Sequence, residues 1–192
     1  MKIIKIKNKK KTREEMLTDI INILKKGGLV IMPTETLYGA MVDATNPKAV
    51  RKLVTYKNRP TGKPFSIAVT SQEMAEKYVY LNQKAKALYK KFLPGPLTII
   101  SKGKHKVASG IESERGTLGI RIPNHWLVLK IIEKLGKPIT ATSANASYKK
   151  RPYKISDILD NLSQKQKGLI NLIVDAGKLP LNDPSTVIDT TY

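Results

Sequence analysis

The apolar residues of this chain fall into short blocks that switch repeatedly between a helical and an extended spacing. Apolar positions 16, 17, 20, 21 and 24 recur as on one face of a helix, whereas residues 29–32 form a continuous apolar run typical of a buried strand. The same patterns alternate to the C-terminus, which predicts an α/β fold. Because several adjacent strands lack a crossover helix, we expect an open, twisted sheet that is mixed rather than wholly parallel, with helices flanking it.

The chain length suits one domain, which we place over residues 1–192, with residues 1–12 as a basic N-terminal strand and lead-in. A length of 192 residues lies within the usual domain range of ~50–250 residues. No apolar block approaches the ~18–20 residues that a membrane span requires. The first residues mix apolar and charged side chains, unlike a secretory signal. We therefore expect a cytoplasmic protein without a membrane segment.

Capping residues and glycine or proline breaks set the expected element bounds. Thr12 with Glu15 predicts a capping box, Asn46 and Pro47 open a second helix, and Thr70 with Glu73 and then Ser156 cap shorter ones. The longer later helices are expected at 82–92 and 124–135. Strands are expected at 2–6, 29–32, 65–69, 97–101, 118–122, 138–141, 169–174 and 185–189. The polar stretch 102–116 predicts a mobile loop.

Composition excludes several classes of site. The chain has no cysteine and only two histidines, His105 and His125. Disulfides and thiolate nucleophiles are therefore excluded, and a zinc site is not expected. We assign no metal ligand to the chain and expect any metal to arrive with a substrate.

Positive charge dominates the sequence. Lys and Arg number 35 against 15 acidic residues, a formal net charge of +20. Such a field attracts polyanions, so nucleotides and RNA are natural partners. The alternative is that lysine runs such as residues 9–11 merely decorate a solvated surface.

A first polar cluster, residues 33–39, directly follows an apolar strand. Thr34, Glu35, Thr36 and Tyr38 bring two hydroxyls, a carboxylate and a phenol into one turn. Ligands of α/β folds bind at the carboxyl ends of strands, so this cluster can hold a small polar molecule. The alternative is a threonine-rich turn that caps itself.

A second cluster is the basic loop that contains Lys57, Arg59 and Lys63, with prolines at 60 and 64. A lysine point charge and an arginine fork suit a polyphosphate whose charge grows as pyrophosphate leaves. The alternative is a solvated basic loop.

A third cluster, residues 140–145, again follows a strand. Its small residues allow close approach of a ligand, and Ser143 and Asn145 can bind phosphate oxygens or a base. The alternative is a small-residue turn that bonds to its own backbone. The chain carries neither a Walker loop nor a dinucleotide-binding glycine motif. On the strand near 118–122, Thr117, Gly119 and Arg121 alternate and so share one face.

Together these segments resemble a known family. Their order along the chain is Pro-Thr-Glu-Thr-x-Tyr-Gly, Lys-x-Arg-Pro-x-x-x-Pro, Leu-Pro-Gly-Pro-Leu-Thr, Arg-Ile-Pro, Ser-Ala-Asn and Pro-Ser-Thr-Val-Ile-Asp, over about residues 13–190. This series resembles the YrdC/TsaC family of threonylcarbamoyl-AMP synthases. The resemblance implies a single YrdC-like domain with a concave basic cleft. It also implies an enzyme that condenses L-threonine, bicarbonate or carbon dioxide, and ATP into threonylcarbamoyl-AMP and pyrophosphate for tRNA modification.

The resemblance also implies roles for individual residues. Lys57 and Arg59 become the catalytic cations, and Thr36, Tyr38 and Arg121 the residues that hold threonine. The nucleotide-binding residues become Arg59, Lys63, Thr117, Ser143, Asn145 and Ser185. Magnesium is expected to arrive with ATP, and a separate threonylcarbamoyl transferase complex is expected downstream. Segments 102–116 and 147–154 are the candidate lids.

The chain also departs from the family pattern at three positions. Many relatives have asparagine where this chain has Lys63, and some have histidine where it has Ala68. After Ser147, relatives usually have glycine where this chain has Tyr148. Two other functions stay open: a double-stranded RNA or tRNA-binding module that uses the same basic surface, and a carbamoyl-handling domain of the hydrogenase-maturation type.

Overall fold

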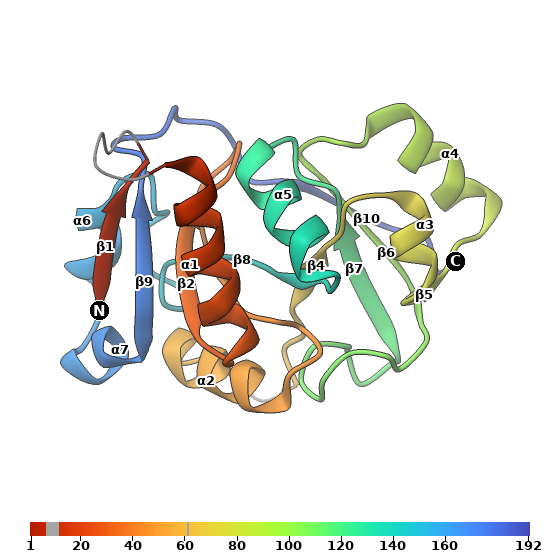
Figure 1. The fold of residues 1–192 in the computed structure, drawn as a ribbon. Helices are drawn as coiled ribbons and strands as arrows, with labels where there is room; N and C mark the ends of the chain where they lie inside the picture. Colours follow the sequence, from red (N-terminus) through yellow and green to blue (C-terminus); the bar gives the residue numbers. More distant parts are fainter. Residues whose placement is uncertain (7–11, 61) are drawn as a thin grey trace.

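The strands form one mixed sheet, as the sequence predicts. The computed structural model describes residues 1–6, 12–60 and 62–192, so the lysine run 9–11 and most of the lead-in lie outside the described residues. The strand order is β1-β9-β2-β3-β8-β4-β7-β6-β10, and β5 pairs with β6 (Figure 1). The strands are β1 (Lys2–Lys5), β2 (Leu29–Pro33), β3 (Tyr38–Met41), β4 (Ser66–Ala68), β5 (Val79–Tyr80), β6 (Leu97–Gly103), β7 (Thr117–Arg121), β8 (Ile139–Ser143), β9 (Ile170–Asp175) and β10 (Thr186–Asp189).

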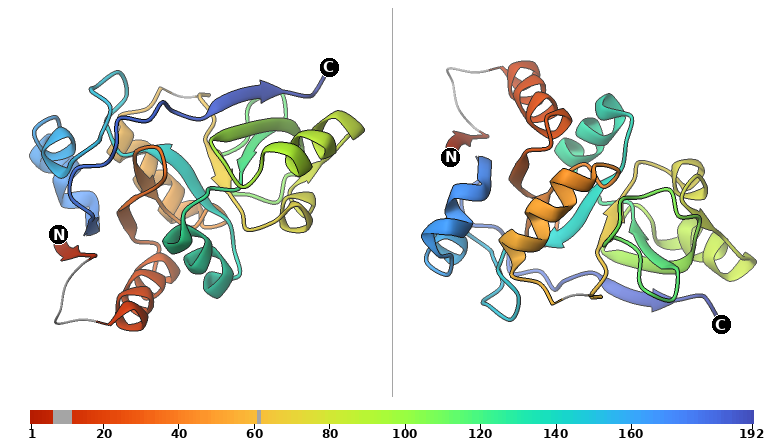
Figure 2. Two further views of the ribbon diagram at one scale, coloured as in Figure 1. Left: turned by 90° about the horizontal axis from the view of Figure 1, so that it is seen from above. Right: turned by 90° about the horizontal axis from the view of Figure 1, so that it is seen from below.

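Helices cover the sheet. They are α1 (Arg13–Lys25), α2 (Pro47–Lys57), α3 (Gln72–Glu76), α4 (Gln83–Phe92), α5 (Trp126–Leu135), α6 (Ile155–Leu159) and α7 (Gln164–Leu169). Figure 1 shows α1 and α5 side by side in front of the sheet, and the two views of Figure 2 place α2 on the opposite side. The N- and C-termini lie at opposite ends of the molecule.

Strand β8 joins the two halves of the sheet. It pairs antiparallel with β3 on one side and with β4 on the other. The β1–β9–β2 group and the β4–β7 pair are parallel, so each half keeps its own parallel strands. This arrangement brings the ends of strands that are distant in sequence onto one surface, where the polar clusters lie.

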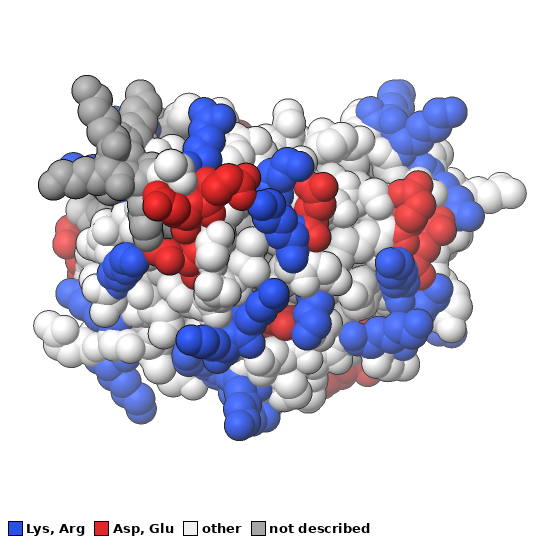
Figure 3. Space-filling view, in the orientation of Figure 1, with Lys and Arg blue, Asp and Glu red and all other residues white. Residues whose placement is uncertain are grey.

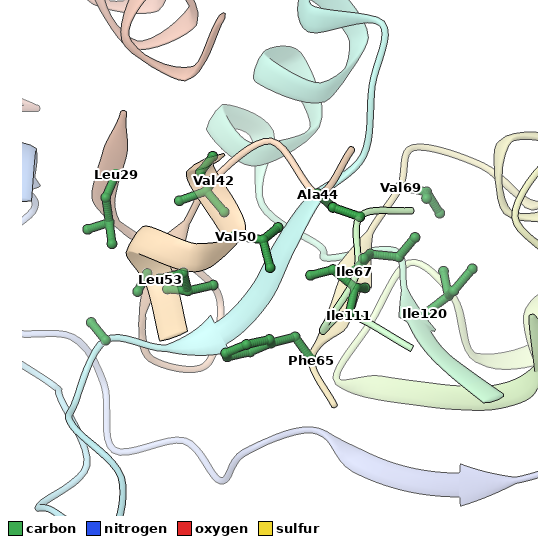
Figure 4. Packing of buried hydrophobic residues seen from close by; sticks show 14 of the residues in the cluster. Leu29, Val42, Ala44, Val50, Leu53, Phe65, Ile67, Val69, Ile111 and Ile120 are labelled. Atoms are coloured by element: carbon green, nitrogen blue, oxygen red, sulfur yellow. The ribbon is translucent and has the colours of Figure 1, made fainter. Parts of the chain in front are cut away.

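Two hydrophobic layers hold the helices on the sheet. Ile20 of α1 and Ile131 of α5 pack with Val30 and Ile139 on one face. On the other face, Val50 and Leu53 of α2 belong to a larger cluster, which Figure 4 shows running from Leu29 past Phe65 to Val69 and Ile120. Each fully buried side chain of this size contributes about 1.5–3 kcal/mol relative to an exposed one.

Two of the four predicted helix starts are confirmed. The Oγ1 of Thr12 accepts from the Glu15 N–H at 3.2 Å, and a Glu15 carboxylate oxygen accepts from the Thr12 N–H at 2.7 Å. The side chain of Asn46 caps α2, with Pro47 at the first helical position. Both motifs are read correctly from sequence because donor and acceptor lie within one turn of each other.

The other two predicted caps are wrong. Ser71, not Thr70, caps α3, because its Oγ accepts from the Met74 N–H at 3.2 Å. Ser156 lies inside α6, and an Asp157 carboxylate oxygen accepts from the Lys154 N–H at 3.2 Å at the start of that helix. At α3 the sequence offers two adjacent hydroxyl residues, and the structure uses the second; at α6 the N-cap is Lys154, which has no hydroxyl.

The sequence missed two strands and one helix and misjudged one loop. Strand β3 starts at Tyr38, within a segment predicted as a turn, and neither β5 nor α7 was expected. Strand β6 continues to Gly103. The remainder of segment 102–116 is anchored, because Ile111 is fully buried and its carbonyl accepts from the Phe65 N–H at 3.0 Å.

Positive charge is spread widely over the surface that Figure 3 shows. Lysine and arginine side chains occur across the whole width of this face, with acidic side chains between them. This pattern fits the solvated-surface interpretation for much of the net charge. No helix in the described parts of the chain is long and apolar enough to cross a membrane.

Candidate active site

A cavity of about 430 Å³ opens on the sheet face that carries α5. Its floor comes from neighbouring strands and includes Gly39 and Met41 of β3, Ala68 of β4 and Ala141 of β8, and Val128 of α5 contributes a wall. Small side chains at three of these floor positions leave the volume open. Six predicted site residues line this one cavity: Thr36, Tyr38, Arg121, Ser143, Asn145 and Ser185.

The turn after β2 places Thr36 at the cavity. The Oγ1 of Thr34 accepts from the Thr36 and Leu37 N–H groups, at 3.1 Å each, so Thr34 caps the turn itself. This is the self-capping alternative, and it holds for Thr34. Thr36 is only 5% exposed and lines the cavity, with its hydroxyl 3.0 Å from that of Thr34. Both threonines line the cavity, and the Thr34 hydroxyl also donates to the Leu37 carbonyl at 2.7 Å within the turn.

Arg121 is a buried cation at the end of β7. It is 8% exposed, and its Nη2 donates to a carboxylate oxygen of Glu35 at 2.5 Å. The same oxygen accepts from the Asn124 N–H at 3.1 Å. Glu35 therefore fixes one edge of the guanidinium and offsets part of its charge. The Nε of Arg121 is buried without a protein partner, so one donor of this cavity-lining guanidinium remains unpaired.

Tyr38 lines the cavity, but its hydroxyl is engaged elsewhere. It donates to the Gly177 carbonyl at 2.8 Å and accepts from the Ala176 N–H at 2.9 Å. Burial raises the pKa of Tyr38 to about 12, so the phenol stays protonated at neutral pH. The hydroxyl anchors the turn after β9. The role of Tyr38 in holding threonine stays a prediction. Because the hydroxyl is engaged, only the ring or the backbone of Tyr38 would contact threonine.

Lys57 lies beneath the Ser-Ala-Asn segment and does not line the cavity. It is 3% exposed, and its ammonium donates to the Ser143 carbonyl at 2.6 Å and to the Asn145 carbonyl. Burial lowers the pKa of Lys57 to about 7, and the positive charges of Arg59 and Lys63 add to this effect. The structure therefore places this predicted catalytic cation under the loop that carries two nucleotide-binding candidates.

Arg59 and Lys63 also lie outside the cavity lining. The Nε of Arg59 donates to the Lys63 carbonyl at 3.0 Å, its Nη2 donates to the Pro64 carbonyl, and its guanidinium lies 4.3 Å from the centre of the Phe65 ring. Lys63 is exposed, and its ammonium lies 5.0 Å from the centre of the Tyr148 ring. Tyr148 does line the cavity, so Lys63 lies next to a cavity-lining residue without lining the cavity itself.

Thr117 lies at the opposite end of β7 from Arg121. Its hydroxyl is 2.7 Å from that of Ser113, and it does not line the cavity. Gly119 lies between Thr117 and Arg121, and a Cβ there would come within 2.6 Å of the Ser66 hydroxyl and 3.2 Å of the Thr98 methyl carbon. This close approach explains the glycine.

Ser185, in the C-terminal segment, lies close to the Thr98 side chain that also packs beside Gly119. Its Oγ lies 3.0 Å from the Thr98 hydroxyl, and it also lines the cavity. Ser185 therefore links the cavity to the buried Thr98 of β6.

Two cations at the cavity were not among the predicted site residues. Lys149 and Arg151 line it, and together with Arg121 they are the charged groups among its described lining residues, none of which is acidic. The sequence did carry a signal, because residues 147–154 form a basic segment directly after the Ser-Ala-Asn motif. The sequence predicts for that segment only the role of a candidate lid.

Unpaired buried polar atoms gather around this site. Within the described ranges they belong to Glu35, Arg121, His125, Asn145 and Ser147, with Tyr89 elsewhere. Each of the first five lies within two residues of one that lines the cavity. Because buried polar groups are nearly always hydrogen-bonded, this concentration is typical of a site that binds a polar ligand.

The described residues contain no group of three or more His, Cys, Asp or Glu side chains that could hold a metal ion. The cavity instead offers hydroxyls, a primary amide and guanidinium or ammonium groups. Such a site suits a small carboxylate together with a phosphate-bearing ligand.

Comparison with known proteins agrees with this chemistry. A family model described as Sua5_yciO_yrdC, Telomere recombination, matches residues 22–192. A putative threonylcarbamoyl-AMP synthase of Methanocaldococcus jannaschii is 39% identical, over 97% of this chain and 86% of that protein. The threonylcarbamoyl-AMP synthase of Bacillus subtilis is 34% identical over 92% of this chain, which spans only 51% of that longer relative.

Solved structures share the whole fold. Sua5 of P. abyssi in complex with L-threonine superimposes with a TM-score of 0.88 and 32% identity, over 98% of this chain and 54% of that one. YciO of E. coli gives a TM-score of 0.84 at 25% identity, over 100% of this chain and 90% of that one. The fold is thus common to these proteins, and the chain belongs to the Sua5/YciO/YrdC family.

Proposed function

We propose that this chain is a threonylcarbamoyl-AMP synthase, which condenses L-threonine, bicarbonate or carbon dioxide, and ATP into threonylcarbamoyl-AMP and pyrophosphate. The relatives that carry this name support the proposal. The observation that carries it is that Arg121 and Thr36 share one cavity with Ser143, Asn145 and Ser185. A site for a small amino acid and a site for a nucleotide are then neighbours, as the reaction requires.

The amino-acid subsite would lie at Arg121. A carboxylate pairs well with a guanidinium, and Glu35 leaves the buried Nε of this arginine for that purpose. The Thr36 hydroxyl lines the same cavity and can bond a second polar group of threonine. The apolar side chains of Ala68 and Val128 would face its methyl group.

The nucleotide subsite would extend from Ser143 and Asn145 toward Ser185. The Oδ1 of Asn145 is buried without a protein partner, whereas its Nδ2 donates to the Lys149 carbonyl at 2.6 Å. The side chains of Lys149 and Arg151 add positive charge for phosphate groups. Lys57 would act from beneath by holding the carbonyls of Ser143 and Asn145 in place.

The reaction needs alignment and charge stabilisation rather than a side-chain nucleophile. The threonine nitrogen forms a bond to the carbon of carbon dioxide and loses a proton. A carbamate oxygen then bonds to the α-phosphorus of ATP while the bond to the bridging oxygen breaks and pyrophosphate leaves. Neighbouring subsites supply the alignment. Fixed cations stabilise the charge that grows on the leaving group.

Magnesium would accompany ATP in this scheme. The cavity lining offers no carboxylate among its described residues, so the phosphates and water would supply the oxygen ligands that magnesium prefers. The ion would offset phosphate charge. Transfer of the threonylcarbamoyl group to tRNA would fall to a separate complex.

Pyrophosphate release by the purified chain tests the proposal. We expect release that requires threonine, bicarbonate and magnesium-ATP together, and a product with the mass of threonylcarbamoyl-AMP. Omission of threonine is the internal control. Wild-type protein that binds neither ATP nor threonine, or that releases pyrophosphate equally without threonine, would contradict the proposal.

A further inference from the structure

Tyr148 occupies an unusual position at the mouth of the cavity. Its side chain is 85% exposed, and its backbone has a φ of 64°, in the left-handed region that favours glycine. Tyr148 is nevertheless one of the residues that line the cavity. A bulky residue in this conformation is held at a cost, and such strain concentrates at ligand sites.

The turn that carries Tyr148 is fixed to the body of the protein. The Lys149 N–H donates to the Ala146 carbonyl at 3.1 Å, which places Tyr148 third in a four-residue turn. The Ser147 N–H donates to the Lys57 carbonyl at 3.0 Å. The Asn145 amide closes the turn on the Lys149 carbonyl. The aromatic ring is therefore presented from an anchored position.

Lys63 comes from a different loop and meets this ring. Its ammonium lies 5.0 Å from the ring centre, a cation–π arrangement. Lys63 belongs to the loop after α2 and Tyr148 to the loop after β8, so this contact joins two segments that are distant in the sequence.

The cavity suits a ligand with both an aromatic face and negative charge beside this ring. Among its described lining residues the aromatic ones are Tyr38, which is fully buried, and Tyr148. Only Tyr148 can offer a ring face to a ligand, and Lys149 and Arg151 lie next to it along the chain. Bases stack on aromatic rings of this kind.

We propose that Tyr148 is the stacking platform for the adenine base of ATP, and that Lys63 orients its ring. This inference rests on the proposed function and assigns one more binding residue to it. The base would lie against the exposed ring, and the phosphates would run toward Lys149, Arg151 and the Ser143 segment.

Two ligands separate stacking from phosphate binding. Calorimetric titration of the full chain with magnesium-ATP and with inorganic tripolyphosphate measures affinity with and without a base. We expect Tyr148→Gly to weaken ATP binding about tenfold, equivalent to about 1.4 kcal/mol, and to leave tripolyphosphate binding unchanged. Tyr148→Phe, the matched control, should bind both ligands as the wild type does. Tyr148→Gly should also melt no lower than the wild type, because glycine adopts this φ without strain.

A double-mutant cycle tests the role of Lys63. Lys63→Met should weaken ATP binding when Tyr148 is present and have no further effect in the Tyr148→Gly background. Loss of tripolyphosphate affinity in both backgrounds would show instead that Lys63 binds phosphate, and would overturn its orienting role.

The outcomes also separate this inference from the proposed function. Wild-type turnover together with unchanged ATP affinity in Tyr148→Gly would overturn the stacking role alone. So would an equal loss of affinity for both ligands. A wild-type chain that binds no ATP would overturn both proposals.

Discussion

The ammonium of Lys57 donates a hydrogen bond of 2.6 Å to the carbonyl oxygen of Ser143, 86 residues further along the chain. A second bond to the Asn145 carbonyl makes this lysine a brace between α2 and the loop that follows β8. A lysine that is 3% exposed cannot be a freely mobile phosphate ligand in this arrangement. The ammonium lies beneath the Ser-Ala-Asn segment and holds the backbone of that segment through these two hydrogen bonds.

The buried Lys57 predicts a specific pH dependence of stability. Its folded pKa is lowered to about 7, whereas the unfolded value is the ordinary 10.5. Between these values the unfolded chain binds more protons, so the free energy of unfolding should rise with pH by up to about 1.4 kcal/mol per unit. Lys57→Met should lose this slope between pH 7.5 and 9.5, as chemical denaturation at several pH values would show. The exposed Lys48→Met on the same helix is the control, and an unchanged slope in Lys57→Met would refute the assignment.

The buried ion pair of Arg121 and Glu35 predicts separable effects on folding and binding. Arg121→Ala leaves the largely buried Glu35 carboxylate without its cation, with only the Asn124 N–H as partner, and should lower the free energy of unfolding by about 3–5 kcal/mol. The double variant Arg121→Ala/Glu35→Ala should recover much of this stability but not the affinity for threonine. Denaturation and threonine titration measure the two quantities. If the double variant regained its affinity for threonine, the proposed pairing of the threonine carboxylate with Arg121 would be wrong.

The engaged hydroxyl of Tyr38 predicts a structural effect of its removal. Tyr38→Phe leaves the Ala176 N–H and Gly177 carbonyl without their partner and should cost about 1–3 kcal/mol of stability. The KM for threonine should change less than twofold. Tyr80→Phe, at an exposed tyrosine, is the matched control. A large rise in the KM for threonine with unchanged stability would instead show that the hydroxyl binds substrate.

Removal of magnesium should affect the reaction of ATP but not the binding of threonine. Chelation with EDTA should abolish pyrophosphate release, because the leaving phosphates lose their counter-charge, while threonine affinity stays within twofold. Calorimetry with and without EDTA, with calcium-free buffer as the reference, measures the second quantity. Loss of threonine binding on chelation would show that a metal belongs to the amino-acid subsite.

Local patterns carried much of the fold. The capping box of Thr12 and the Asn46-Pro47 start were readable because their partners lie three or four residues away. The mixed sheet followed from strands without crossover helices. Strand β3 was missed because Gly39 and its polar neighbours have the composition of a turn, and only pairing with β2 and β8 makes them a strand.

The sequence by itself determined the alternation of helices and strands and the set of polar segments from which a site could be built, because these depend on residue type and short spacing. Only the tertiary structure decided that Arg121 pairs with Glu35, that Lys57 braces Ser143, and that Tyr148 meets Lys63. Each of these contacts joins residues more than 80 positions apart, and the packing of β8 between the two halves of the sheet brings their segments together.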